Sequence, residues 1–279
     1  MKLYKIEAGT FIADGGAMFG VVPKKAWVKR YPCDEENFCT LAMRCMLADT
    51  GDKLILVDTG VGNKHMDKTK YYRMQDTVDF EIELNKLGYT CEDVTDVVLT
   101  HLHFDHCGGC TYFDTDGELA LTFPNAVHWV GKTQWENFIH PNVREGESYF
   151  RENMIPVENA GKLKLISEDQ WLCPEVELRI YDGHTNGQIS PYFHSNGKTL
   201  VYAGDVIPVL ASIPIAWVSS YDTYPITSME EKERMLGEAV EKNQILFFEH
   251  DNYSECCSVH LVNGRYKLNE VLKLEKVNF

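Results

Sequence analysis

The chain lacks the features that mark exported, membrane-spanning and disulfide-bonded proteins. None of its apolar runs reaches the roughly 18 residues that a membrane helix needs. The amino end has an acid, Glu7, where a signal peptide would be apolar. Nine cysteines, an odd number spread from Cys33 to Cys257, do not resemble a disulfide framework. We therefore expect a soluble, cytoplasmic protein without a membrane partner.

Positive charge is also scarce. Asp and Glu number 42 against 27 Lys and Arg, which gives a formal net charge of -15, and the densest basic patch, Lys24, Lys25, Lys29 and Arg30, is short. Because binding to phosphate backbones depends on Lys and Arg clusters, we expect no nucleic-acid partner. No segment rich in Pro, Gly or Ser divides the 279 residues, so we predict a single domain spanning residues 1–279.

The hydrophobic pattern predicts two strand-rich halves, each ending in a helix. The turn at Asp49-Thr50-Gly51-Asp52 predicts a hairpin. Helices are predicted over 76–87, ending at Gly88, over 132–138, and over 228–242, where Thr227 or Ser228 would cap the helix and Glu230 and Glu231 would lie in its first turn. Strands are predicted over 1–6, 38–47, 54–57, 97–100, 127–130, 163–166, 176–181, 192–194, 199–202 and 245–249. The polar stretch after Pro141 is expected to be a mobile connection. Two mixed sheets packed face to face beneath outer helices would form a four-layer α+β sandwich.

Four potential metal ligands lie within six positions directly after the predicted strand 97–100. They are contained in His101-Leu102-His103-Phe104-Asp105-His106, which Cys107-Gly108-Gly109 follows. Side chains alternate along a strand and diverge at a turn, so this cluster can serve two ions at once. Three imidazoles and a carboxylate suit zinc, which keeps a position open for water in catalytic sites. The alternative is a His-rich surface loop.

Three further ligand candidates, His184, Asp205 and His250, each follow an apolar strand at a turn. Ligands gathered from separate strand ends of one sheet edge are a common way to aim several side chains at one point. Taken singly, these residues could be a turn former, a helix cap and a core histidine. Together with the cluster, they predict a metal site.

The combined pattern resembles that of the metallo-β-lactamase superfamily over nearly the whole chain. Its H-x-H-x-D-H, H, D, H series is matched by His101, His103, Asp105, His106, His184, Asp205 and His250. The resemblance implies an αβ/βα sandwich with two divalent ions, one held by His101, His103 and His184 and the other by Asp105, His106 and His250. It also implies that Asp205 bridges the ions and that Asp58, in Val57-Asp58-Thr59-Gly60, supports the ligands from behind.

This resemblance implies a dinuclear, metal-dependent hydrolase. A metal-bridging hydroxide would be the nucleophile, and Asp105 and Asp205 would be the catalytic carboxylates. Zinc is the first expectation, although manganese, iron or cobalt also suit these ligands. The chain resembles the quorum-quenching lactonase and methyl parathion hydrolase-like branch most closely. We therefore expect a small apolar lactone or ester as the substrate, and a homodimer.

The segment 206–217, which is apolar and rich in proline, is predicted to form a wall or lid of the substrate pocket. An ordinary buried connection is the alternative. The best-known acyl-homoserine lactonases place a Tyr three residues after the bridging Asp, and Pro208 stands there in this chain. A bulky lactone, ester or phosphotriester therefore remains open, as does a thioester of the glyoxalase II type or a metal-binding sensor without turnover. Phe19, Trp27 and Trp135 are expected in the core, and Cys107, beside Cys110, is expected to be a packing residue.

Overall fold

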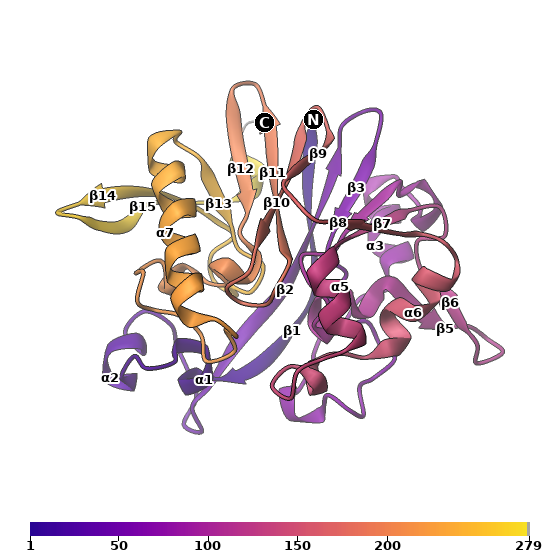
Figure 1. Cartoon of the computed structure of the whole chain (residues 1–279), viewed down its shortest axis with the longest axis horizontal. Coiled ribbons are helices and arrows are strands. Elements are labelled where there is room, and N and C mark those ends of the chain that lie inside the picture. Colours follow the sequence, from indigo (N-terminus) through magenta and orange to yellow (C-terminus); the bar gives the residue numbers. More distant parts are fainter. Residues whose placement is uncertain (278–279) are drawn as a thin grey trace.

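Two mixed β-sheets, one from each half of the chain, lie face to face between two layers of helices (Figure 1). The computed structural model describes residues 1–277. The first sheet has the order β1-β2-β3-β4-β7-β8, in which β3, β4, β7 and β8 run parallel to one another. Its strands are β1 Lys2–Asp14, β2 Phe38–Asp49, β3 Leu54–Val57, β4 Asp96–Val98, β7 Val127–Gly131 and β8 Leu163–Ile166.

The second sheet has the order β15-β14-β13-β12-β11-β10-β9 and is antiparallel except between β12 and β13. Helix α7, Pro225–Glu241, connects these two parallel strands, since a parallel pair needs a crossover. The strands are β9 Gln170–Cys173, β10 Val176–Tyr181, β11 Gln188–Ser195, β12 Lys198–Tyr202, β13 Ile245–Phe247, β14 Cys256–Val262 and β15 Arg265–Leu272. A separate hairpin pairs β5 Thr111–Phe113 with β6 Leu119–Leu121.

Helices cover the outer face of each sheet. Figure 1 shows α7 on one flank and α3, α5 and α6 on the other. Besides α7, the helices are α1 Gly15–Phe19, α2 Lys24–Trp27, α3 Phe80–Leu87, α4 Phe104–Cys107, α5 Lys132–Ile139 and α6 Arg151–Asn159. Short 3-10 helices cover Lys70–Tyr72, Cys91–Asp93, Gly108–Cys110, Gly146–Ser148, Gly204–Val206, Leu210–Ser212 and Leu274–Lys276. No helix within residues 1–277 has both the length and the apolar character needed to span a membrane.

Three apolar clusters hold the layers together, as the four-layer prediction requires. Side chains from both sheets, such as Ile55, Trp129 and Phe193, fill the space between the sheets. A second cluster lies between the first sheet and its helices, and a third joins the second sheet to α7 through residues such as Met235 and Leu236. The predicted α+β four-layer sandwich is confirmed.

Most predicted elements are present, but several bounds were wrong. Strand β1 continues to Asp14, well beyond the predicted end at residue 6. Helix α7 begins at Pro225, so neither Thr227 nor Ser228 caps it and its first turn has no acidic residue. Helix α3 begins at Phe80, is capped by the Asp79 side chain and ends, as predicted, at Gly88 with a φ of 87°. The stretch after Pro141, predicted to be a connection, contains α6.

Candidate metal centre

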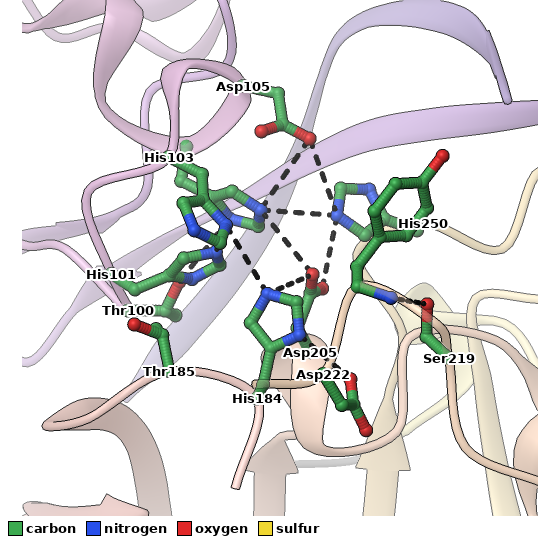
Figure 2. A network of polar contacts seen from close by, with 12 residues as sticks. Thr100, His101, His103, Asp105, His184, Thr185, Asp205, Ser219, Asp222 and His250 are labelled. Atoms are coloured by element: carbon green, nitrogen blue, oxygen red, sulfur yellow. Dashed lines mark hydrogen bonds and ion pairs between the residues drawn. The ribbon is translucent and has the colours of Figure 1, made fainter. Parts of the chain in front are cut away.

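The candidate ligands lie just beyond the carboxyl ends of four strands, at one edge of the sandwich. The His101 to His106 cluster follows β4, and His184, Asp205 and His250 follow β10, β12 and β13. Gly108 and Gly109 let the cluster approach the loop after β3, because a Cβ added to either would lie 2.0 to 2.3 Å from the carbonyl oxygen of Val61 or Thr59. The fold therefore brings together all seven side chains that the sequence selects (Figure 2).

His101, His103 and His184 form a first triad. The Nδ1 atom of His103 lies 2.9 Å from Nε2 of His101 and 3.3 Å from Nε2 of His184. Burial lowers the pKa of His101 and of His103, which keeps both rings neutral and able to donate a lone pair. These three nitrogens converge on one point.

Asp105, His106 and His250 form a second triad. The Nε2 atoms of His106 and His250 are 3.2 Å apart. The Oδ2 atom of Asp105 lies 3.7 Å from the first of these nitrogens and 3.8 Å from the second. This triad has the same compact geometry as the first, with one carboxylate in place of an imidazole.

Asp205 spans the two triads. Its Oδ2 lies 3.2 Å from Nε2 of His184, and its Oδ1 lies 3.1 Å from Nε2 of His250. Burial would raise the pKa of Asp205, but His250 and His184 outweigh it and hold that pKa well below its usual range. Asp205 is therefore an ionised carboxylate that faces both groups of ligands.

The donor set fits divalent ions. Nitrogens bound to zinc at 2.0 to 2.1 Å in a tetrahedron would lie about 3.3 Å from one another, close to the separations found here. Oδ1 of Asp205 is buried without a hydrogen-bond donor, as expected of an oxygen that coordinates a cation. Assignment of the seven residues as metal ligands stays a prediction, supported by this convergence.

The ring nitrogens that face away from the two triads contact supporting groups. Nδ1 of His106 lies 3.1 Å from Asp58, whose carboxylate also accepts hydrogen bonds from the backbone N–H and hydroxyl of Thr100, both at 2.7 Å. Nδ1 of His250 donates to the Ala42 carbonyl at 2.8 Å, and Nδ1 of His184 to Asp222 at 2.9 Å. Such contacts fix which nitrogen is free for a metal. Asp58 thus lies where the resemblance placed it.

Three supporting acids have no role in the sequence prediction. Asp222 contacts His184, and Glu249, fully buried, lies 3.1 Å from Nδ1 of His106. Burial, reinforced by Asp58, raises the pKa of Glu249 to about 8. Burial would also raise the pKa of Glu145, but the nearby imidazole of His103 and hydrogen bonds from Thr185 and Asn137 lower it instead. Glu249 directly precedes His250, the one sequence signal available for the three; Glu145 and Asp222 lie in segments without a motif.

A cavity of about 300 Å³ opens onto both triads. One side is aromatic: Phe11 packs edge-on against His250 at 5.4 Å between ring centroids, and Tyr72 contacts Phe104 at 5.2 Å. Arg144, Ser219 and Tyr221 also line the cavity. The sequence did not identify the aromatic side, because Phe11 lies in the part of β1 that was not predicted.

The predicted pocket wall at 206–217 was wrong for most of its length. Pro208 alone of this segment lines the cavity, whereas residues such as Ile207 and Ile213 pack against α7. Most of this segment therefore packs into the core as a buried connection, which is the alternative that the sequence left open. Phe19, Trp27 and Trp135 are in the core, as predicted.

Cys107 and Cys110 are fully buried packing residues. The Cys107 thiol donates weakly to the carbonyls of Leu102 and His103 at 3.4 Å. Burial raises the pKa of both thiols. The expectation for Cys107 as a packing residue is consistent with this position.

Comparison with known proteins gives one family match and several relatives. Residues 44–241 match the model of the metallo-β-lactamase superfamily. The N-acyl homoserine lactonase AiiA of Bacillus thuringiensis subsp. kurstaki is 27% identical over 270 residues, covering 90% of this chain and 93% of the relative.

Solved structures show the same fold. A probable metal-dependent hydrolase from Staphylococcus aureus has a TM-score of 0.87 and 31% identity, with 98% of each chain covered. AidC, a dizinc quorum-quenching lactonase solved in complex with a product, has a TM-score of 0.76 at 21% identity, covering 96% of this chain and 93% of AidC.

Proposed function

The chain belongs to the metallo-β-lactamase superfamily, as a hydrolase of the kind that acts on ester bonds, and we propose that it uses a dinuclear metal centre to open lactones or cleave esters that carry apolar groups. One observation carries this proposal. Two triads of ligands, spanned by Asp205, face a cavity of about 300 Å³ with an aromatic side.

The seven ligands divide into two sets in this proposal. His101, His103 and His184 would hold one ion, Asp105, His106 and His250 would hold the other, and Asp205, which faces both groups, would contact both ions. Two divalent ions, zinc in the first instance, would supply a Lewis acid for the carbonyl and a water whose pKa is lowered toward about 7. Two of the relatives are named as lactonases, one of them dizinc, which supports this assignment.

Asp105 and Asp205 are the carboxylates that act on the reacting atoms. Oδ2 of Asp105 faces His106 and His250, which leaves its Oδ1 free to carry a proton to the leaving oxygen. Both carboxylates line the cavity, with side chains 13% exposed. Asp205 contacts ligands of both triads and so fixes their relative position. The activated water would therefore approach the carbonyl of the substrate from a fixed direction.

The aromatic side of the cavity selects the substrate. Phe11, Tyr72 and Phe104 offer apolar surface beside the ligands, which suits the acyl or alkyl part of an ester. Arg144 is the one Lys or Arg among the described residues that line this cavity, so a substrate with several carboxylates, such as a glutathione thioester, would find little to bind it. Carboxylic esters and lactones are therefore favoured over the thioester alternative.

The test combines elemental analysis with a substrate screen. The purified protein is expected to contain about two divalent ions per chain and to hydrolyse lactones or esters faster as the apolar group lengthens. Removing the metal with a chelator should abolish activity, and adding zinc should restore it. Acetyl and hexanoyl versions of one substrate serve as the matched pair.

Two results would contradict the proposal. Full activity of the metal-free protein would exclude metal catalysis. A preference for thioesters or phosphotriesters over every lactone and ester would assign the site to one of the alternative reactions. Three further expectations stay predictions. Gel filtration can test the homodimer, denaturant unfolding can test the single domain, and cell fractionation can test the cytoplasmic location.

A further inference from the structure

His103 differs from the other four histidines of the two triads in the nitrogen that it points at the centre. His101, His106, His184 and His250 each turn Nε2 inward, whereas His103 turns Nδ1 inward. Nε2 of His103 is therefore directed away from the centre, into the protein. It is buried without a hydrogen-bond partner as placed, and Oε1 of Glu145 lies 3.5 Å from it.

Glu145 is a buried carboxylate surrounded by donors. It is 3% exposed. Its Oε1 accepts hydrogen bonds from the hydroxyls of Tyr149, at 2.9 Å, and Thr185, and its Oε2 accepts from the side-chain amides of Asn137, at 2.9 Å, and Asn142. The single hydroxyl proton of Tyr149 also faces Oε1 of Gln134, at 3.1 Å, so Oε1 of Glu145 can accept from an N–H of the His103 ring in addition to Thr185.

The segment that carries Glu145 also reaches the surroundings of His184, another ligand of the first triad. Arg144 donates to the Ser220 carbonyl and, at 3.5 Å, to the Asp222 carbonyl. The Asp222 side chain contacts Nδ1 of His184. The segment 142–148, which lines the cavity through Arg144, Glu145 and Ser148, therefore contacts the groups around both His103 and His184.

We propose that Glu145 is a positioning residue: it accepts a hydrogen bond from Nε2–H of His103 and thereby fixes the tautomer that leaves Nδ1 free to bind the ion of the first triad. This inference rests on the dinuclear centre of the proposed function. A ring held in the opposite tautomer would present an N–H, which cannot coordinate, toward that ion. The affinity of the first triad for its ion therefore depends on the conformation of the segment 142–148, which carries Glu145.

The test is Glu145→Gln, with Glu147→Gln as the matched control. Glu147 lies two residues away in the same segment, is exposed and loses the same charge. Zinc affinity is measured by competition with a chromophoric chelator. We expect one of two sites in Glu145→Gln to weaken about 10- to 100-fold, the usual effect of losing a group behind a ligand, while the other site and the control stay at wild-type affinity. Equal affinities in all three proteins would overturn the inference.

A measurement on the wild type covers the case in which Glu145→Gln does not fold. Long-range 1H–15N spectra of zinc-loaded protein distinguish rings bound through Nδ1 from rings bound through Nε2. Since His103 alone of the five points Nδ1 inward, we expect one Nδ1-bound ring whose Nε2–H exchanges slowly with solvent. Rapid exchange of that proton, or five Nε2-bound rings, would reject the role of Glu145. A wild type that binds no zinc would instead reject the dinuclear centre itself.

Discussion

The two triads of the metal centre differ in what supports them. Behind the second triad stand groups on strands or at their ends: Asp58 directly after β3 contacts His106, and the Ala42 carbonyl of β2 accepts from His250. Behind two ligands of the first triad stand groups on connecting segments, Glu145 near His103 and Asp222 beside His184. The third ligand, His101, contacts the Thr100 hydroxyl at 3.1 Å, just after β4. The second triad is thus anchored in the sheets, whereas two of the three ligands of the first triad depend on loops.

This difference predicts which of the two proposed ions the protein would hold more rigidly. Strand ends are fixed by hydrogen bonds along the whole sheet, whereas loop conformations change more readily with sequence and with bound ligand. We expect the second triad to hold its ion with an affinity set by the fold. The affinity of the first triad can be tuned by the loops that support His103 and His184.

The largest effect is expected from Asp205→Asn, which removes the group that joins the two triads. An amide cannot give a charged oxygen to each side, so affinity at both sites should fall and turnover should drop by about 100-fold or more, since metal charge stabilisation is worth several kcal/mol and each 1.36 kcal/mol is tenfold in rate. Circular dichroism should stay that of the wild type. Full turnover in this variant would show that the triads act independently.

The next effect is a contrast between Asp58→Asn and Asp222→Asn. In Asp58→Asn an amide N–H would face one of the donors of Thr100, leaving a buried donor unpaired, so unfolding stability should fall by about 1 to 3 kcal/mol together with metal affinity. Asp222→Asn should weaken one site about 10- to 100-fold and leave stability nearly unchanged. Denaturant unfolding and zinc competition measure both quantities. If Asp222→Asn destabilises the protein as much as Asp58→Asn does, the distinction between sheet and loop support is wrong.

The same division between strand ends and loops separates the parts of the centre that the sequence predicts from those that it does not. The strands were predictable because β-branched and leucine-rich runs such as Leu54–Val57 end at turns, and the ligands follow these runs at once. Asp58 was predicted from the resemblance of Val57-Asp58-Thr59-Gly60 to a family motif, and it directly follows such a strand. Glu145 could not be found, since its role depends on the path of a connection between α5 and α6 that no periodicity determines. The aromatic side of the cavity was missed because the extension of β1 to Asp14 depends on pairing with β2, a contact distant in sequence.

A further effect depends on pH and concerns Lys232, which lies on α7 and contacts the segment after Asp205. Its ammonium donates to the carbonyls of Ser212 and Trp217 at 3.0 and 2.8 Å. Burial, opposed by Asp222, lowers its pKa from 10.5 to about 8. Between these values the unfolded chain binds more protons than the folded one, so stability from this group rises with pH. Relative to Lys232→Met, the wild type should gain about 2 to 3 kcal/mol between pH 7 and pH 10. A constant difference across that range would show that Lys232 stays charged in its site.

The smallest effect is expected at Cys107, which packs directly beneath the backbone of the first triad. Replacing it with Ala removes one buried sulfur and should cost about 1 kcal/mol of stability, measured by denaturant unfolding. Because burial raises the pKa of this thiol and no thiolate reaches the solvent, a mild oxidant should inhibit wild type and Cys107→Ala equally. Greater resistance in the variant would mean that the backbone around His103 opens often enough to expose Cys107. That result would show that the backbone of the first triad's own ligands moves, in addition to the loops that support them. Oxidation of Cys107 would then be a route by which the proposed ion of this triad is lost.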